Sequence, residues 1–495
     1  MGKVETIDEA VLHDLRAWGG NAEMSAFEAV MWRAEVDPRL RSTTTSVLIL
    51  DRAPDWPRLY AGHRWLVDAV PRFRQRVVSP AFGVGHPTWV EDPGFDLDYH
   101  LRRISLPAPG SDRQLFDLAQ TLAMTPFDRA RSPWEATLVE GLSGGRAGYV
   151  LKLHHATSDG LGIIQLMSRV LQRTPEGGGR PTPRRAAGTA RDTTPAQLAR
   201  QQLRAGLLGL PGEAAGTVSS LASGLRDWAT RPAALKEAQR YLSSARRVLG
   251  TKPVKGSGLF KRRSLSWRFD AIEIPLVDLK AAAKAAEASV NDAFLAGLIG
   301  GFGRYHETMG VPVRRMPIGF PISLRSSDDP MGGNKFAGSQ YAAPISERDP
   351  IARIRDIQRF VRETRQEPAL DIMIRLMPAV TRLPLAAITA MTADFTTAQD
   401  AQISNIPGLT HPVYMAGAEV THFWPFAPVP GCGMMIAMIS HNGRCCIGIN
   451  SDRAAVIEPE LLIECFRAGL DEVLALGRPA GEERAAETKS KRKVK

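Results

Sequence analysis

The segment 149–171 carries the clearest pattern of apolar and polar positions in the chain. Residues 149–153 read Tyr-Val-Leu-Lys-Leu, and apolar side chains at every second position predict a strand. Successive strand residues face opposite sides of a sheet, so the pattern places His155 on the apolar face and His154 on the other face. The two adjacent histidines are therefore expected in different surroundings.

A turn and a helix are predicted directly after this strand. Asp159-Gly160 supplies the turn, and Ser158 or Asp159 supplies the N-cap of the helix. Apolar residues then recur at helical spacing: Ile163, Ile164, Met167, Val170 and Leu171. An imidazole at the end of a strand, facing a dry interior, is well placed to take a proton from a substrate hydroxyl. His155 is therefore a candidate general base.

The second half of the chain predicts a further series of strands and helices. Apolar patterns indicate strands at 265–269 and 316–324 and helices at 279–286 and 289–304. Ser289 and Asp292 are spaced as a capping box, which explains the pair Asn291-Asp292 as an ordinary helix start. An Asn-Gly pair at 442–443, between two apolar runs, predicts a hairpin.

Length and composition indicate two mixed α/β (α+β) domains. A chain of 495 residues is too long for one ordinary domain. Residues 1–172 are expected to form the first domain and residues 257–475 the second. Residues 173–256 read as a linker with broken amphipathic helices, and residues 476–495 as a basic, disordered tail.

Charge and cysteine usage limit the classes of partner and compartment. The formal net charge is +11, and five of the positive charges lie in the last seven residues. This balance favours anionic membranes or phosphate-bearing substrates, whereas no nucleic-acid motif is present. No apolar run is long enough for a transmembrane helix, and the N-terminus has no signal-peptide pattern. Four cysteines fit a reducing, cytoplasmic interior without disulfides.

The stretch His154-His155-x-x-x-Asp159-Gly160 resembles the active-site motif of CoA-dependent acyltransferases. That superfamily includes chloramphenicol acetyltransferases, plant alcohol acyltransferases and the condensation domains of peptide synthetases. A metal site is a weaker interpretation, because adjacent strand residues face opposite sides and only one would easily reach a common ion. Two buried core histidines remain the plain structural alternative.

Further segments narrow the resemblance to the bacterial wax ester synthase/diacylglycerol acyltransferase family. The similar segments follow in the family's order: 24–32, 89–100, 132–135 with Trp134, Asn291-Asp292, 321–325 ending in Arg325, Gly333-Asn334, and 404–408 with Asn405. An ordered set of this kind is far more specific than any single motif. The chain departs from the family pattern at Glu28, at Ser132-Pro133 and at Leu409.

The resemblance implies a two-domain acyltransferase fold with mixed sheets, a tunnel between the domains and His155 midway along it. It implies an acyl-CoA donor, diacylglycerol or a long-chain alcohol as acceptor, and neither a metal nor another cofactor. His155 would be the general base, and Asn291 would donate to the oxyanion. Asp159 would hold its loop through an ion pair with an arginine, and His154 would support the site. Motif support is expected from Gly160, Trp134, Asp292, Arg325 and Asn405.

Other functions stay open at this point. They are a peptide-synthetase condensation domain, an acyltransferase that uses a carrier-bound donor or another alcohol, and a lipid-binding homologue of low activity. The segment Gly141-x-Ser143-x-Gly145 matches the pattern of a nucleophile elbow, but a strand follows it where an elbow requires a helix. A turn is therefore predicted there, and no covalent acyl intermediate.

Peripheral binding to membranes or lipid droplets is also expected. The substrates implied by the resemblance partition into lipid, and the sequence offers no spanning helix as an anchor. The basic tail at 489–495 and the amphipathic region 196–249 are the segments expected to touch an anionic surface.

Overall fold

The computed structural model describes most of the chain. The described residues are 9–83, 85–178, 183, 193–204, 239–241, 243–244, 254–323, 336–369 and 372–478. The expectations for Arg325, for Gly333-Asn334, for the basic tail and for most of the linker lie outside these residues.

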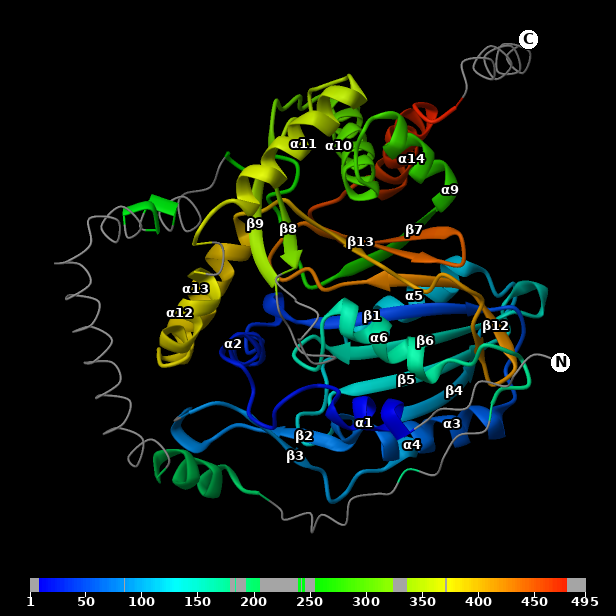
Figure 1. The fold of residues 1–495 in the computed structure, drawn as a ribbon, viewed down its shortest axis with the longest axis vertical. Coiled ribbons are helices and arrows are strands. Elements are labelled where there is room, and N and C mark those ends of the chain that lie inside the picture. Colours follow the sequence, from blue (N-terminus) through cyan, green and yellow to red (C-terminus); the bar gives the residue numbers. More distant parts are fainter. Residues whose placement is uncertain are drawn as a thin grey trace.

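Two six-stranded sheets organise the described chain (Figure 1). The first has the order β11-β12-β1-β6-β5-β4. Its strands are β1 (Thr43–Leu50), β4 (Leu101–Ser105), β5 (Trp134–Glu140), β6 (Ala147–His154), β11 (Tyr414–Met415) and β12 (Ala418–Phe426). The predicted strand is β6, which pairs antiparallel with β1 from Ala147 to His154. β11 and β12 come from the second half of the sequence, so the chain crosses between the two predicted domains.

The second sheet has the order β7-β14-β13-β10-β8-β9, with β10 parallel to both of its neighbours. Its strands are β7 (Trp267–Pro275), β8 (Met316–Ser323), β9 (Phe336–Ala343), β10 (Ala401–Ile406), β13 (Met434–His441) and β14 (Arg444–Asp452). The predicted hairpin joins β13 to β14. Asn442 and Gly443 both take positive φ angles there, 43° and 80°, as a two-residue type I′ turn requires. A small separate sheet pairs β2 (Gln75–Val78) with β3 (Thr88–Glu91).

Helices cover the sheets in the arrangement that Figure 1 shows, with α9, α10, α11 and α14 over the second sheet and α1, α3 and α4 at the opposite end of the view. The first group of helices is α1 (Glu9–Ala17), α2 (Ala26–Ala34), α3 (Trp56–Ala69), α4 (Leu97–His100), α5 (Asp112–Met124) and α6 (Gly160–Val170). The second group is α9 (Leu276–Ala285), α10 (Val290–Thr308), α11 (Pro350–Arg365), α12 (Ile372–Val380), α13 (Leu385–Thr397) and α14 (Pro459–Ala475). The helices predicted after β6 and at 279–286 and 289–304 are confirmed as α6, α9 and α10.

Three apolar clusters hold these layers together. One lies within the second sheet and its helices, and another joins the first sheet to α1, α3 and α6. A third unites the two sheets, because α5 side chains such as Leu115 pack with Phe269 of β7 and Phe426 of β12. The rings of Phe269 and Phe426 stack with centroids 4.0 Å apart. None of the described helices combines the length and the apolar character that crossing a membrane requires.

Candidate active site

His155 follows the last residue of β6 and faces a cavity. Its backbone N–H donates to the carbonyl of Ser42 at 2.8 Å, which ties it to the start of β1. The side chain lines the cavity together with Asp159 and with residues of α6. The predicted strand phase is therefore confirmed, since Thr44 and Ser46 of β1 line the same cavity and pair with Leu153 and Leu151, the residues of β6 expected to share a face with His155.

The cavity has a volume of about 520 Å³ and is bounded by both halves of the chain. Helix α2, the start of β1 and the segment from His155 to Ile164 bound one side, while β8, β9, β10, α12, α13 and β13 bound the other. Its walls are mainly aliphatic and aromatic, for example Val30, Phe320 and Phe395. A chamber of this kind suits a long hydrocarbon chain, and it lies where the resemblance places a tunnel.

Two motifs from opposite halves of the sequence meet at this cavity. Asp159 is the N-cap of α6, and its Oδ1 accepts a hydrogen bond from the N–H of Gly162 at 2.9 Å. Gly160 packs so closely on Ile406 of β10 that a Cβ atom would overlap the Ile406 side chain. A larger residue at position 160 would force the end of the Ile406 side chain to move. Asn405, the neighbour of Ile406, also lines the cavity.

His154 lies on the opposite face of the sheet and is fully buried. The N–H of Ala156 donates to its Nδ1 at 3.0 Å, so the ring proton is assigned to Nε2. Nε2 faces Oε2 of Glu35 at 3.3 Å. The edge-to-face contact with Trp32, at 4.8 Å between ring centroids, fixes the plane of the imidazole.

Glu35 connects the two histidines, and no sequence motif pointed to it. Glu35 Oε1 accepts a hydrogen bond from the backbone N–H of Ser42 at 3.0 Å. The backbone carbonyl of Ser42 in turn accepts a hydrogen bond from the backbone N–H of His155. Burial alone would raise the pKa of the Glu35 carboxyl. His154, the N–H of Ser42 and the charge of Arg129 outweigh burial and hold that pKa below its ordinary value.

The structure does not bring Asn291 to the cavity. Asn291 lies in the first turn of α10, and neither it nor Asp292 is among the described residues that line the cavity. Asp292 completes the predicted capping box with Ser289, its side chain accepting from the backbone of Ser289 at 3.0 Å. The placement therefore gives no support to Asn291 as an oxyanion donor, whereas Asn405 is among the residues that line the chamber.

Other motif residues have structural roles. Trp134 is buried and donates from its indole N–H to the carbonyl of Phe73 at 2.7 Å. Glu28, which stands where the family has an aspartate, forms a capping box with Ser25 at the start of α2. Leu409 is part of the buried core around the first sheet. These departures from the family pattern therefore lie in packing and capping positions.

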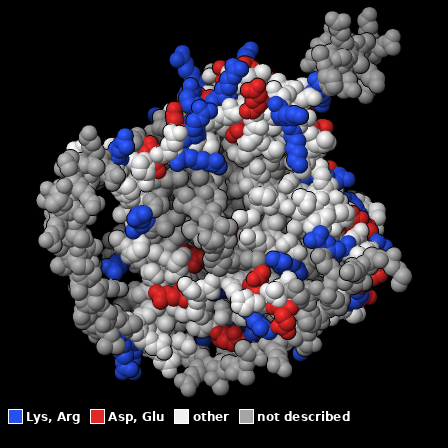
Figure 2. All heavy atoms as spheres, viewed as in Figure 1, with Lys and Arg blue, Asp and Glu red and all other residues white. Residues whose placement is uncertain are grey.

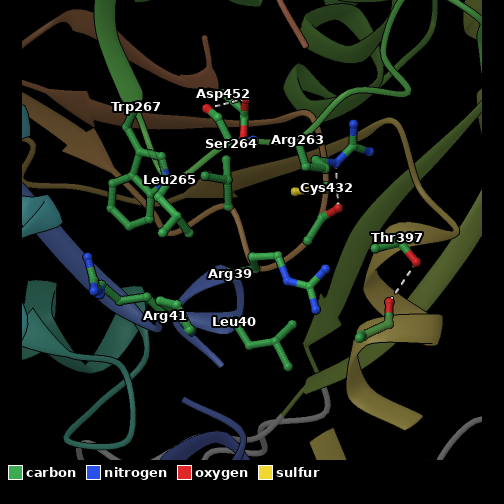
Figure 3. Close-up of a pocket in the computed structure, with 14 residues that line it drawn as sticks. Arg39, Leu40, Arg41, Arg263, Ser264, Leu265, Trp267, Thr397, Cys432 and Asp452 are labelled. Atoms are coloured by element: carbon green, nitrogen blue, oxygen red, sulfur yellow. Dashed lines mark hydrogen bonds between the residues drawn. The ribbon is translucent and has the colours of Figure 1, made fainter. Parts of the chain in front are cut away.

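A second, smaller pocket of about 50 Å³ adjoins the cavity (Figure 3). The two share Leu40, and three arginines line the smaller one: Arg39, Arg41 and Arg263. Arg39 is ion-paired with Asp37 at 2.6 Å. Arg263 donates to backbone carbonyls such as that of Gly431 at 2.7 Å, and no carboxylate among the described residues lies within ion-pair distance of it. Asp452 also lines the pocket, so three arginines stand against one carboxylate and the lining is net positive.

Within the described chain, no serine or cysteine is set up as a nucleophile. Ser143 is exposed in the turn η4 (Ser143–Gly145) between β5 and β6, as predicted. The four cysteines are free and buried, and burial raises the pKa of the Cys432, Cys445 and Cys446 thiols to about 12. No cluster of three or more His, Cys, Asp or Glu side chains in this part of the molecule is arranged to hold a metal ion.

Two models of known protein families match the chain. The family model described as "Wax ester synthase/diacylglycerol acyltransferase catalytic domain" matches residues 22–294, and the one described as "WS/DGAT C-terminal domain" matches residues 332–473. The chain belongs to the wax ester synthase/diacylglycerol acyltransferase family. The resemblance found in the motifs is thereby confirmed, and with it the assignment to the acyltransferases of this family.

Relatives of known sequence cover nearly the whole chain. A putative diacylglycerol O-acyltransferase of Mycobacterium tuberculosis (strain H37Rv) is 38% identical over 467 residues, which are 92% of this chain and 93% of the relative. Another putative diacylglycerol O-acyltransferase of the same strain is 29% identical over 459 residues, 88% of this chain and 93% of the relative.

Solved structures confirm the fold of this family member. The wax ester synthase/diacylglycerol acyltransferase of Marinobacter aquaeolei VT8 aligns with a TM-score of 0.63 at 19% identity, over 92% of this chain and all of that chain. The first condensation domain of the calcium-dependent antibiotic synthetase aligns with a TM-score of 0.61 at 16% identity, over 92% and 96% of the two chains. The mixed α/β acyltransferase fold expected from the motifs is confirmed.

Proposed function

We propose that this protein transfers a fatty acyl group from acyl-CoA to the hydroxyl of diacylglycerol, of a long-chain alcohol, or of both. The observation that carries the proposal is the position of His155 in an apolar chamber bounded by both halves of the chain. The names of the relatives support the diacylglycerol acceptor. The chamber volume of about 520 Å³ supports substrates with hydrocarbon chains.

The reaction needs one base and no covalent enzyme intermediate. His155 accepts the proton of the acceptor hydroxyl as the oxygen attacks the thioester carbonyl. The tetrahedral intermediate then collapses, the carbon–sulfur bond breaks, and the proton passes from His155 to the CoA thiolate. The products are an ester and free CoA. General-base assistance is typically worth about 10²–10⁴-fold in rate, and holding both substrates in one chamber adds a proximity term.

The oxyanion of the intermediate needs a hydrogen-bond donor, and we assign this role to Asn405. Asn405 belongs to β10 and is one of the residues that line the chamber. Removing one oxyanion donor costs about 10²–10³-fold in turnover. We expect Asn405→Ala to lower turnover in this way and Asn291→Ala to act through protein stability.

The electropositive pocket beside the chamber is proposed to receive the phosphates of CoA. Leu40 is common to both, so a thioester in the chamber has an arginine-lined pocket next to it. Arg263→Gln is expected to raise KM for palmitoyl-CoA about fivefold to thirtyfold, because a charged hydrogen bond of this kind contributes about 1–2 kcal/mol. KM for palmitoyl-pantetheine, which lacks the phosphates, should not change. Arg262, exposed and outside the pocket, supplies the matched control Arg262→Gln.

Purified protein and radiolabelled palmitoyl-CoA, offered hexadecanol and diolein in parallel, test the proposal. Wax ester or triacylglycerol must appear in proportion to enzyme, and His155→Ala must form it at least about a hundredfold more slowly. A protein that transfers acyl groups only from an acyl carrier protein would be the carrier-dependent alternative. A protein that binds these lipids without any turnover would be the low-activity homologue. We also propose that the protein works at a lipid surface, because its substrates partition into lipid.

A further inference from the structure

Large exposed apolar side chains gather on one part of the molecule. They belong to the α12–α13 hairpin and to the loop that contains η3 (Ala81–Gly83): Phe82, Leu376, Leu383, Leu385 and Met391. We call these five residues the apolar tip. Single exposed apolar residues are normal on protein surfaces, but a group of them marks a site of contact.

Hydrogen bonds hold the Phe82 loop against the hairpin. Arg33 of α2 donates through Nη1 to the carbonyl of Thr381 at 2.7 Å and through Nη2 to the carbonyl of Gly83 at 3.4 Å. Nε2 of His86 contacts Oγ1 of Thr381 at 3.1 Å. Thr381 lies directly between α12 and the turn that carries Leu383. Phe82 and the hairpin turn are therefore parts of one surface.

The hairpin is apolar both where it is buried and where it is exposed. Met377 and Ile388 are buried against Val30 of α2. Leu383, Leu385 and Met391 are 40%, 45% and 49% exposed. The exposed positions of a helix on an ordinary water-facing surface are mostly polar. Figure 1 shows α12 and α13 side by side, beside α2 and away from the two sheets.

Basic residues outnumber acidic ones on the hairpin. From α12 to the end of α13 the charged residues are Arg375 and Arg382 against the single carboxylate Asp394. The hairpin follows α11, whose last turn contains Arg362 and Arg365. Figure 2 shows Lys and Arg side chains, with Asp and Glu among them, at the end of the molecule that carries α10, α11 and α14, which is not the end where the tip lies. An apolar edge with arginines beside it is complementary to a phospholipid surface.

The tip is continuous with the chamber of the active site. Leu376 and Met391 are exposed and also line the cavity that contains His155, and Val380 lines it between them in the sequence. A lipid acceptor that enters between these side chains stays in apolar surroundings from the lipid phase to the base. The exposed residues of the tip are therefore placed at an entrance through which a lipid acceptor can reach the chamber.

We propose that the apolar tip is the part of the protein that inserts into a phospholipid surface and admits the lipid acceptor to the chamber. This inference rests on the proposed function for its choice of a lipid partner. It assigns the contact to the described hairpin and the Phe82 loop, where sequence alone pointed to the basic tail and to region 196–249.

Vesicle binding of a tip variant tests the inference without any assay of turnover. In the double variant Leu383→Ser/Leu385→Ser, binding to vesicles of equal parts phosphatidylcholine and phosphatidylglycerol should fall about tenfold or more, because both replaced side chains lose their apolar contact. Val277 and Ile457 are 69% and 60% exposed on other surfaces. Val277→Ser/Ile457→Ser is the matched control and should bind as the wild type does.

A fluorescent label reports where the lipid is. All four native cysteines are buried, so a cysteine introduced at an exposed position reacts selectively with an environment-sensitive dye. The dye on Leu385→Cys should shift to the blue when vesicles are added, and the dye on Val277→Cys should not. Both variants should keep the melting temperature of the wild type, since both positions are exposed.

The outcomes separate this inference from the proposed function. Loss of vesicle binding in the tip variant, with acyl transfer to a short, water-soluble alcohol unchanged, supports the tip. The inference is overturned if the tip variant binds normally while deletion of residues 489–495 abolishes binding. It is also overturned if the wild type does not bind vesicles. It is overturned as well if the wild type is a dimer and the tip variant is a monomer, because a second copy of this chain would then cover the apolar tip. Absence of acyl transfer in a protein that still inserts its tip would refute the proposed function alone.

Discussion

His154 and His155 occupy consecutive positions at the end of β6, and their side chains meet opposite surroundings. His154 points to the face with Glu35 and Trp32, where each ring nitrogen has a defined neighbour. His155 points to the face that carries the chamber, among residues from both halves of the chain. A strand turns each successive side chain to the other face, so one position in the sequence separates two different roles.

This comparison shows how a fold separates a supporting group from a reacting group of the same chemical type. Nδ1 of His154 accepts a backbone N–H, so protonating it would place two donors against each other. His154 is therefore fixed in one tautomer and suits a structural role. The His155 imidazole, at the wall of a chamber, is placed to exchange a proton with a substrate.

The largest expected effect comes from removing the proposed base. In His155→Ala, turnover with palmitoyl-CoA and diolein should fall by about 10²–10⁴-fold, which is the usual contribution of a general base. The melting temperature should stay close to that of the wild type, because the variant keeps the backbone N–H that donates to the carbonyl of Ser42. The radiochemical assay and circular dichroism are the two measurements. Wild-type activity in a folded His155→Ala protein would remove His155 from the mechanism.

His154→Ala should have the reverse signature. The change empties a buried site beside Trp32 and takes away the group that faces the Glu35 carboxylate. Leaving a buried polar group without its partner costs about 1–3 kcal/mol. We expect a loss of this size in urea unfolding, and turnover per folded molecule should stay within about tenfold of the wild type. Intact stability combined with lost turnover would make His154 a reacting group and abolish the contrast.

Asp159, like His154, is expected to act mainly on stability. The loss of stability on replacing Asp159 should be smaller than that on replacing His154. The Asp159 carboxylate caps α6, and loss of a cap costs about 1 kcal/mol. Asp159→Ala removes the cap and the charge, whereas Asp159→Asn keeps a capping oxygen and removes only the charge. We expect both changes to lower the melting temperature at least as much as they lower specific activity. Turnover lost in Asp159→Asn at an unchanged melting temperature would point to direct contact with the substrate.

Local patterns were enough to predict the elements that carry the site. Strand alternation predicted the orientation of both histidines, helical spacing predicted α6, and the Asn-Gly pair predicted the β13–β14 turn. Each of these features depends on residues that lie close together in the sequence. The place of β12 in the first sheet had no such signal, because its pairing with β1 joins residues nearly 400 positions apart (Thr45 with Phe426).

Only those site residues that belong to a recognisable sequence motif could be predicted from the sequence. Glu35 is a single carboxylate after α2, and only the packing of α2 against the end of β6 brings it to His154. The family resemblance marked Asn291 and Asn405 alike, and only the tertiary fold separates a helix start from a chamber wall. The apolar tip was missed because apolar residues in a helix indicate burial by default, and their exposure depends on what packs around them.

The smallest expected effect is a pH dependence that separates the two histidine environments once more. The folded pKa of Glu35 lies below its ordinary value of 4.5. A carboxyl whose pKa is depressed by folding contributes stability that is present above the unfolded pKa and is lost as the pH falls through the folded pKa. The free energy of unfolding should therefore decrease more steeply on acidification below about pH 5 in the wild type than in Glu35→Gln. Urea unfolding at a series of pH values measures this difference.

The pH profile of kcat/KM should keep its acidic midpoint in Glu35→Gln, because His155 and not the Glu35–His154 pair exchanges the proton. A midpoint that moves with Glu35→Gln would mean that the two faces of β6 are coupled through Ser42, and the division of roles between the histidines would then be incomplete.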